Sequence, residues 1–431
     1  MTAAMRVVLA GITGTEKRAV ASKLADHLPR IRPEWTNRIK VIDLEECIQK
    51  SGGGDTRLFA GLPNSQLQRL RWLDGWKVAQ DEFAHSGATC QILFLHLMYA
   101  TRGLRSCAAD LASIAAWQPN ILLTLIDDIY SIKRRIELKH YSFSLAQLYD
   151  WRMTEQVVAD KIAVLTDALV NTSENARKIA RCESLALAVK TPLESAARLI
   201  GKLGFPRAYA SYPITSTRSN PVLRQEINEF RKRMHLIMPT FDPLTIEELP
   251  ILRFYIPGEG PVHYDPKRGP PGREDDEECK RWDARVGTGN LEPLVWEPDT
   301  ATDATGTAVN FFPVSIERRE FDELGLPEGG EGYTTIHDQL TFRDLRFVSQ
   351  ADMVVCYRPY MDGSVSGGVN TEIENANMLT RPVVAYVGKD KLKGKPLQGH
   401  ITHTFTEEKK FWAYLEEEAK KNLTSPRASY F

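Results

Sequence analysis

The sequence predicts an α/β protein of two three-layer domains, each built on a mostly parallel sheet. Short apolar segments alternate with longer amphipathic ones, and strands separated by helices form parallel sheets with right-handed crossovers. Glycine-rich turns at 11–14 and 363–368 each follow an apolar segment and run into a predicted helix. The length of 431 residues also suffices for two or three domains with cores of their own.

The first domain is expected over residues 1–203. Short apolar runs predict five strands, at 6–10, 39–43, 91–96, 121–126 and 184–189. Apolar side chains at three- and four-residue spacing predict helices at 16–27, 64–87 and 144–170. Pro192 opens a further helix, because proline is favoured in the first helical turn.

The second domain is expected over residues 204–431. Its strands are predicted at 208–214, 238–244, 352–357 and 382–387. Helices are predicted at 220–235, where an Asn-Pro pair marks the start, and at 336–348. Residues 257–332 are rich in glycine, proline and acidic side chains, which predicts a long and partly irregular insertion. Both domains are therefore expected to be Rossmann-like.

Composition and charge narrow the classes of function. The net charge of −1 gives no support for a nucleic-acid or anionic-membrane partner. No apolar run approaches the roughly 20 residues that a membrane helix needs. The N-terminus runs into a strand without the basic and apolar regions of a signal peptide, and the six cysteines are scattered without a CxxC pair. We therefore expect a cytoplasmic protein with free thiols and no metal site.

The glycine loop after the first strand carries part of a phosphate-binding pattern. Residues 11–18 are Gly-Ile-Thr-Gly-Thr-Glu-Lys-Arg, where a P-loop has the form GxxxxGK[ST]. Both glycines and Lys17 fit that use. Arg18 stands in place of the hydroxyl that ligates magnesium, and Glu16 puts a negative charge where phosphates pass.

The segment from 5 to about 200 resembles the adenylate-kinase-like branch of the P-loop nucleotide kinases. The resemblance rests on this loop, on the apolar strand 121–126 that ends at an acid, and on the order of strands and helices. It implies a nucleotide site that can take ATP with magnesium, in which backbone amides and a lysine hold the phosphates. The residues assigned to that site are Gly11, Gly14, Thr15, Lys17 and Asp127. The alternative is a loop that serves structure alone.

A second glycine-rich loop lies between the strands predicted at 352–357 and 382–387. It runs from Asp362 through serines and glycines into a helix that carries Glu372. Ligands of open α/β sheets bind at the carboxyl ends of strands, and helix N-termini attract anions. Breaking an N-glycosidic bond develops positive charge on the sugar, which a positioned carboxylate stabilises or captures. Glu372 is the candidate for that role, although its charge can also simply favour the helix N-terminus.

Residues 207 to about 390, without the insertion, resemble the nucleoside 2-deoxyribosyltransferase-like superfamily. Five ordered features carry the resemblance: strand ends at 210–214 and 241–244, an acid-led strand at 352–355, the loop at 362–372, and the segment 376–383. The resemblance implies that Glu372 attacks or stabilises the anomeric carbon while an aspartate contacts base or sugar. The family pattern D-x-G-T-x-x-E is tighter than the ten-position spacing found here. The resemblance implies hydrolysis of a nucleotide rather than transfer between bases, because related nucleotide hydrolases have serine-rich loops that recognise a 5′-monophosphate.

The predicted catalytic residues are Glu372 and a second acid, Asp362 or Asp352, that protonates or orients the base. The predicted substrate contacts come from the loop and from the two strand ends beside it. They are Tyr212, Pro213, Arg358, Ser364, Ser366, Gly367 and Gly368. Structural alternatives remain for Asp352, at a strand end, and for Tyr212, in the core.

The preferred function is an enzyme that cleaves the N-glycosidic bond of a nucleoside or nucleotide, or transfers its deoxyribosyl group. This chemistry requires no cofactor. One alternative is a P-loop nucleotide or nucleoside kinase whose C-terminal domain is a nucleotide-binding regulatory module. Another is a nucleotide sensor without catalysis. A nucleoside or nucleotide is the expected partner, and a homo-oligomer is expected because members of the resembled superfamily often share sites across subunits.

Overall fold

The computed structural model divides the chain into two compact units, residues 1–189 (unit 1) and 190–424 (unit 2). The division falls before the helix at Pro192, whereas the sequence placed a linker after it. The structure describes these residues: 4–53, 65–101, 104–107, 109–139, 141–171, 182–201, 204–214, 221–246, 248, 262–264, 291–292, 294, 300–302, 308–310, 314–316, 331–361, 364–388 and 400–421.

Unit 1 is built on a five-stranded parallel sheet with the order β2-β3-β1-β6-β7. Its strands are β1 (Met5–Ala10), β2 (Ile39–Asp43), β3 (Cys90–Phe94), β6 (Ile121–Ile126) and β7 (Glu183–Ala188). Every residue of β3 and β6 is buried. Apart from Gln91 and Thr124, the residues of these two strands are apolar, as expected where helices cover both faces of a parallel sheet.

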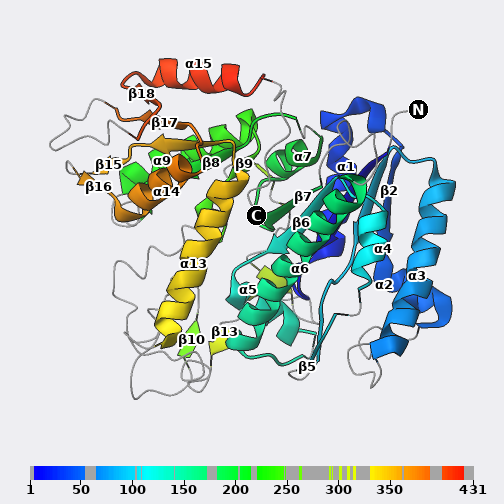
Figure 1. Cartoon of the computed structure of the whole chain (residues 1–431). Coiled ribbons are helices and arrows are strands. Elements are labelled where there is room, and N and C mark those ends of the chain that lie inside the picture. The colour runs from blue at the N-terminus through cyan, green and yellow to red at the C-terminus, as the bar shows by residue number, and fades with distance from the viewer. Residues whose placement is uncertain are drawn as a thin grey trace. The chain divides into compact units, whose positions relative to one another are not determined.

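The helices of unit 1 leave the carboxyl ends of these strands and return over the sheet (Figure 1). One core gathers side chains of α3, α4 and α6 against β1, β3 and β6, while α1 packs along β1, β2 and β3. The elements are α1 (Lys17–Ile31), α2 (Leu44–Ile48), α3 (Ser65–Ser86), the β4 (Tyr99–Thr101) and β5 (Leu104–Ser106) hairpin, α4 (Leu111–Ala116), α5 (Ile129–Glu137) and α6 (Leu145–Asn171).

Helices α2 and α3 approach each other at a glycine. A Cβ placed on Gly75 would lie 2.4 Å from Cγ1 and 2.8 Å from the backbone N and Cα of Ile48. Gly75→Ala should therefore destabilise the protein by about 1–3 kcal/mol through overpacking, although alanine favours a helix by about 1 kcal/mol over glycine. Urea unfolding measures the change, with the exposed Gln80→Ala of the same helix as control. A more stable Gly75→Ala protein would contradict the close approach.

Unit 2 has a second five-stranded parallel sheet, of order β18-β17-β14-β8-β9. Its strands are β8 (Ala208–Ser211), β9 (Thr240–Phe241), β14 (Met353–Tyr357), β17 (Val383–Tyr386) and β18 (His403–Phe405). Strands β8 and β14 are neighbours, but the chain continues from β8 to β9 on one side and from β14 to β17 on the other. This reversal of strand order marks the crevice where open α/β sheets bind ligands.

The helices of unit 2 lie on two sides of its sheet (Figure 1). Ala210 and Tyr212 belong to a core with α9 and α15, whereas the intervening Tyr209 and Ser211 reach α14. Helix α13 packs on α14. The helices are α7 (Leu193–Gly201), α9 (Pro221–Ile237), α13 (Glu331–Gln350), α14 (Gly367–Met378) and α15 (Glu408–Glu418).

Smaller elements complete unit 2. They are a 3₁₀ turn at Pro243–Thr245 and the strand pairs β10 (Val262–Tyr264) with β13 (Val314–Ile316), β11 (Thr300–Thr302) with β12 (Ala308–Asn310), and β15 (Tyr360–Met361) with β16 (Ser364–Val365). Most of the predicted insertion at 257–332 lies outside the described residues, so its role stays a prediction. Among the helices that the structure does describe, none is both long and apolar enough to cross a membrane.

The prediction of an α/β protein with two mostly parallel sheets is confirmed. Strands β2 and β6 begin and end at the predicted residues, and α3 and α6 differ from prediction by one residue at each end. Strand β8 ends at Ser211, three residues before the predicted end at 214. The sequence missed α2, α4, α5 and α15, of which the first three have nine residues or fewer.

Candidate functional site

Glu372 is held by two hydroxyl groups at the carboxyl end of β8. It lies on α14, and its side chain is only 8% exposed. The Tyr209 hydroxyl donates to Oε1 at 2.6 Å, and the Ser211 hydroxyl donates to Oε2 at 2.5 Å. Because alternate residues of a strand point to the same face, these two side chains both meet α14. Each carboxyl oxygen of Glu372 thus has its own partner from the first strand of the crevice.

Burial decides the protonation of Glu372. Loss of water raises its pKa to about 8, although hydrogen bonds from Ser211 and Tyr209 act in the opposite direction. The nearby Asp344 charge contributes to this raised pKa. Most molecules therefore carry a protonated Glu372 at neutral pH. A carboxyl group with a pKa near neutrality can both donate and accept a proton, which is the requirement for general acid–base catalysis.

The first turn of α14 is open. Gly367 and Gly368 are its first two residues and are exposed, and a Cβ added to either would meet no atom within 4 Å. Ser366 stands at the N-cap position, but its side chain makes no capping hydrogen bond. Neither crowding nor a left-handed backbone requires glycine here. The missing side chains leave the backbone N–H groups of the helix N-terminus accessible to an anionic or hydroxyl-bearing ligand.

Neither candidate for the second acid, Asp352 or Asp362, is placed beside Glu372 in the described part of the structure. Asp352 precedes β14, at the end opposite to the crevice, where its Oδ2 accepts a hydrogen bond from the backbone N–H of Arg207 at 2.8 Å. This contact is structural, because it joins the amino ends of two neighbouring strands. Asp362 lies outside the described residues, and Ser364 is described only by its backbone, in β16.

Tyr212 and Pro213 follow β8, and both are buried. Tyr212 belongs to the core on the α9 side of the sheet and donates its hydroxyl hydrogen to Asp242 Oδ1 at 2.5 Å. Asp242 also lies 2.6 Å from the Arg231 Nη2 atom and 3.3 Å from the His235 Nε2 atom. The structure thus places Tyr212 in a buried ionic cluster and apart from Glu372. The hydroxyl that reaches the carboxyl group belongs to Tyr209, three positions earlier.

Arg358 also contacts the α9 side. It follows β14 with a left-handed φ of 48°, which is uncommon for a residue with a side chain. Its Nη1 atom lies 2.5 Å from Glu226 Oε2 on α9, and its backbone N–H donates to the Tyr386 carbonyl at 2.8 Å. The side chain lines a groove of about 740 Å³ between α9 and α15. A phosphate contact from Arg358 at Glu372 would require the guanidinium group to leave Glu226.

Tyr209 and Ser211 were not among the residues predicted from the sequence. The signal that identifies them is the period of two along β8: a side chain two residues from Ser211 shares its face, while Tyr212 has the opposite parity. The strand was predicted to end at 214, which made Tyr212 a candidate for contact with a ligand at the carboxyl end of the sheet. Because β8 ends at Ser211, Tyr212 lies beyond the strand and packs on its opposite side.

The N-terminal loop needs both of its glycines. Gly11 has φ of 144° and Gly14 has φ of 89°, and a Cβ on Gly11 would lie 2.9 Å from the Leu125 carbonyl oxygen. The buried Thr15 hydroxyl donates back to the Ile12 carbonyl at 2.8 Å. The loop therefore turns tightly over β6 and into α1.

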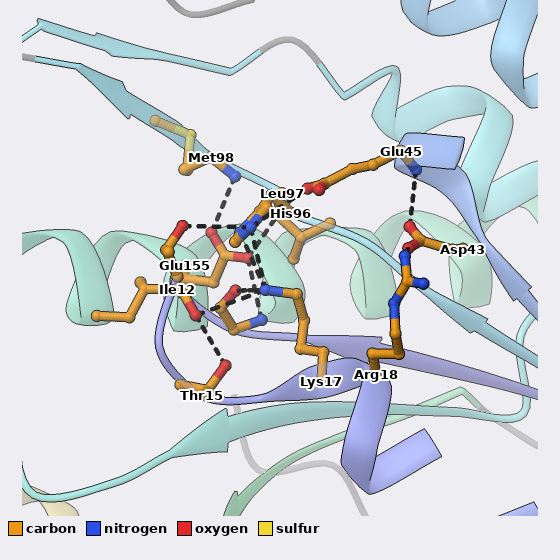
Figure 2. A network of polar contacts seen from close by, with 12 residues as sticks. Ile12, Thr15, Lys17, Arg18, Asp43, Glu45, His96, Leu97, Met98 and Glu155 are labelled. Atoms are coloured by element: carbon orange, nitrogen blue, oxygen red, sulfur yellow. Dashed lines mark hydrogen bonds and ion pairs between the residues drawn. The ribbon is translucent and has the colours of Figure 1, made fainter. Parts of the chain in front are cut away.

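A carboxylate of the protein itself binds the amides at this loop. Glu155 of α6 is fully buried and accepts hydrogen bonds from the backbone N–H groups of Gly11, Leu97 and Met98, at 3.1, 2.8 and 2.9 Å. Figure 2 shows its oxygens directed at these amides. Burial raises the pKa of Glu155, while the amides and the charge of Lys17 lower it. A phosphate at these amides would have to displace this side chain.

Lys17 and Asp127 are likewise engaged within unit 1. Lys17 Nζ donates to the Gly11 carbonyl at 2.7 Å and lies 3.1 Å from His96 Nδ1. Burial and the Lys17 charge hold the pKa of His96 well below its usual value, so the ring is neutral. Asp127 is fully buried, and its Oδ2 accepts a hydrogen bond from Arg135 at 2.7 Å. Gly11, Gly14, Thr15, Lys17 and Asp127 come together, but they do not fit ATP with magnesium in this arrangement.

No protein-family model matches this chain, and a search of curated proteins finds no significant match. Within the described ranges, no group of three or more His, Cys, Asp and Glu side chains is placed to hold a metal ion.

Proposed function

We propose that the protein cleaves the N-glycosidic bond of a nucleoside or nucleotide, with Glu372 as its catalytic residue. The observation that carries the proposal is a buried carboxyl group with a pKa near neutrality, held by two hydroxyl groups at the strand-order reversal of unit 2. The pKa and the position of Glu372 suit a reaction in which one group first donates a proton to the leaving base and then stabilises the positive charge on the sugar.

The reaction uses Glu372 in both protonation states. The protonated carboxyl group gives its proton to a nitrogen of the leaving base as the carbon–nitrogen bond breaks. The carboxylate that remains faces a sugar with positive charge at the anomeric carbon, which it stabilises. Water then adds to that carbon and returns a proton to Glu372. The products are the free base and the free sugar, or the sugar phosphate when the substrate is a nucleotide, and the enzyme is unchanged.

Tyr209 and Ser211 can stabilise Glu372 in both of its protonation states. Their hydroxyl groups can donate to the carboxylate and accept from the protonated acid, so neither state of Glu372 loses a partner. A carboxylate that bonded to the anomeric carbon would instead hold the sugar for transfer to a second base. Hydrolysis and transfer thus share one arrangement and differ in the acceptor.

The open first turn of α14 supports a phosphorylated substrate. The amides at Gly367 and Gly368 and the Ser366 hydroxyl lie one to two turns before Glu372 on the same helix. A helix N-terminus binds phosphate through its free N–H groups. A 5′-phosphate bound there would direct the sugar toward Glu372. No metal or organic cofactor is needed for these steps.

Product analysis by liquid chromatography and mass spectrometry tests the proposal. Wild type and Glu372→Gln would be incubated with nucleosides, nucleoside mono- and triphosphates and NAD, with and without magnesium. Loss of the proton donor should lower the release of base about 10²- to 10⁴-fold. Glu374→Gln is the matched control, because Glu374 is exposed on the same helix and contacts Asn370 at 2.7 Å.

Three outcomes separate the alternatives. Free base that depends on Glu372 supports the glycosidase, and a second nucleoside formed in its place supports transfer. Phosphate transfer that persists in Glu372→Gln would sink the proposal in favour of a kinase. Retained nucleotide without any product would favour a sensor.

A further inference from the structure

A buried thiol lies behind one of the two hydroxyl groups that hold Glu372. Cys356 of β14 is directly beside Ser211 of β8 in the parallel register, and residues paired in this way share one face of the sheet. Both side chains are fully buried. Because the Ser211 hydroxyl reaches Glu372 Oε2 at 2.5 Å, three polar groups follow one another on this face: a thiol, a hydroxyl and a carboxyl group.

The sulfur of Cys356 is a hydrogen-bond partner of the Ser211 hydroxyl. Burial and the Glu372 charge raise the pKa of the Cys356 thiol to about 12, while the hydrogen bond with Ser211 acts in the opposite direction, as a hydroxyl that donates to sulfur does. Cys356 therefore keeps its proton over the range in which Glu372 titrates. A thiol is both a weak donor and a weak acceptor, so it can pair with Ser211 in either direction.

The single hydrogen of the Ser211 hydroxyl makes this partner important. When Glu372 is ionised, Ser211 donates to Oε2 and its oxygen can accept from the thiol. When Glu372 is protonated at Oε2, its O–H group donates to the Ser211 oxygen, and the Ser211 hydrogen needs another acceptor. The register places Cys356 Sγ beside it. Because a buried hydroxyl hydrogen without an acceptor is costly, the protonated state of Glu372 depends on the sulfur more than the ionised state does.

We propose that Cys356 is a positioning residue for Glu372, whose sulfur accepts the Ser211 hydrogen while the glutamic acid holds its proton. The inference rests on the proposed function, in which that proton goes to the leaving base. As it leaves, the Ser211 hydrogen turns from Cys356 Sγ to Glu372 Oε2, and the thiol hydrogen turns to the Ser211 oxygen. Both movements are rotations, so no bond to hydrogen breaks at the serine or the cysteine.

The other groups that act on Glu372 are known and stay in place when Cys356 is changed. Burial holds the pKa of Tyr209 well above its usual value, so this residue keeps its proton and donates to Oε1. The charge of Asp344 comes from α13, where Oδ1 lies 2.8 Å from Arg343 Nη2. On the other side of β14, strand β17 contributes an alanine beside the thiol.

Unfolding free energies from pH 5 to about 9 test this role without substrate. Each Cys356 variant is compared with the same variant carrying Glu372→Gln, so that effects independent of pH cancel. The folded pKa of Glu372 is raised, so the stabilisation by its proton falls as the pH rises and levels off above about 8 in the wild type. Cys356→Ala should level off about one pH unit lower, because it leaves a buried hydroxyl unpaired in the protonated state. Cys356→Ser keeps a donor and an acceptor and should restore the wild-type profile.

Three further variants control the test. Cys90→Ala is the matched control, because Cys90 is an equally buried strand cysteine of unit 1, and it should level off with the wild type. In a Ser211→Ala background, Cys356→Ala should cause no further shift. If Cys356→Ala does not fold, Cys356→Val takes its place, since valine also lacks a hydrogen-bonding group. The role is overturned if the alanine or valine variant levels off with the wild type, or if the serine variant shifts as far as alanine.

Base release separates this role from the proposed function. The rate falls at alkaline pH as the general acid loses its proton, and in Cys356→Ala the fall of kcat should begin about one pH unit lower, with KM unchanged. If base release does not depend on Glu372 while the unfolding profiles shift as expected, the glycosidic reaction is wrong and the role of Cys356 stands. If base release depends on Glu372 and the profiles of Cys356→Ala and wild type coincide, the role of Cys356 is wrong and the reaction stands.

Discussion

Asp242→Asn is expected to lower the free energy of unfolding of the protein by about 3–5 kcal/mol, the range for breaking one partner of a buried ion pair. Asp242 is 1% exposed and Arg231 is 2% exposed. The carboxylate accepts hydrogen bonds from Arg231 Nε at 2.6 Å, from the Tyr212 hydroxyl at 2.5 Å and from the Leu244 backbone N–H at 3.1 Å. Asparagine removes the negative charge, which leaves the buried guanidinium without compensation.

Urea unfolding of Asp242→Asn and of a surface control measures this effect. Glu416→Gln breaks the half-exposed pair with Arg233, where the expected loss is below about 1 kcal/mol. Equal losses in the two variants would contradict the account. Burial raises the pKa of Asp242, but Arg231 and His235 outweigh it and hold the pKa below its usual range. The contribution of Asp242 is therefore present above the ordinary carboxyl pKa and is lost as the pH falls below it.

The second large effect is a pH dependence with the opposite sign, set by Glu372. Its pKa is about 8 in the folded protein and 4.5 ordinarily, so between these values the folded state holds a proton that the unfolded chain releases. The stabilisation is complete below pH 4.5 and is lost as the pH rises toward 8, with a slope of up to about 1.4 kcal/mol per pH unit. Glu372→Gln should remove this loss, because glutamine does not titrate.

Unfolding free energies of wild type and Glu372→Gln from pH 5 to about 9 test this sign. The stability of the variant relative to wild type should rise steadily over the window and level off above pH 8. Glu374→Gln should give a profile parallel to that of the wild type. If the Glu372→Gln profile is also parallel, the carboxyl group is ionised throughout and cannot act as the proposed acid.

The strands and long helices were predictable because their patterns are local. The run Ile121-Leu-Leu-Thr-Leu-Ile126 is apolar at nearly every position, so its burial on both faces follows from its own residues. Helix α14 follows from the glycine loop before it, although Glu372 lies in the middle of the 12-residue helix and not near its start. The short helices α2, α4 and α5 gave no comparable signal, since too few turns are present to establish a helical period.

The partners of the site residues were less predictable because they come from distant parts of the chain. Glu155 meets Gly11 across 144 positions, and nothing near either residue in the sequence indicates the contact. Asp242 accepts a hydrogen bond from the Tyr212 hydroxyl across 30 positions of the sequence. Tyr212, which was predicted to contact the substrate, therefore has a partner in the core. The pKa of Glu372 depends on its burial, which follows from the packing of α14 against α13, β14 and β17 and from the side chains of β8 that reach it. Local sequence patterns predicted the helix or strand that carries each site residue. The hydrogen-bond partners and pKa values of these residues depend on tertiary packing.

Strand β8 has consequences for both faces of unit 2 although it is only four residues long. Its odd-numbered side chains hold one buried carboxyl group, and the tyrosine that follows it holds another on the opposite side. A one-residue slip in its pairing with β14 would turn every side chain to the wrong face and orphan both acids at once. The hydrogen bonds to both buried acids therefore depend on the register of this one strand. Substitutions at 209–212 should therefore alter both the surroundings of Glu372 and the folding of unit 2, so a mutational scan should interpret these positions together.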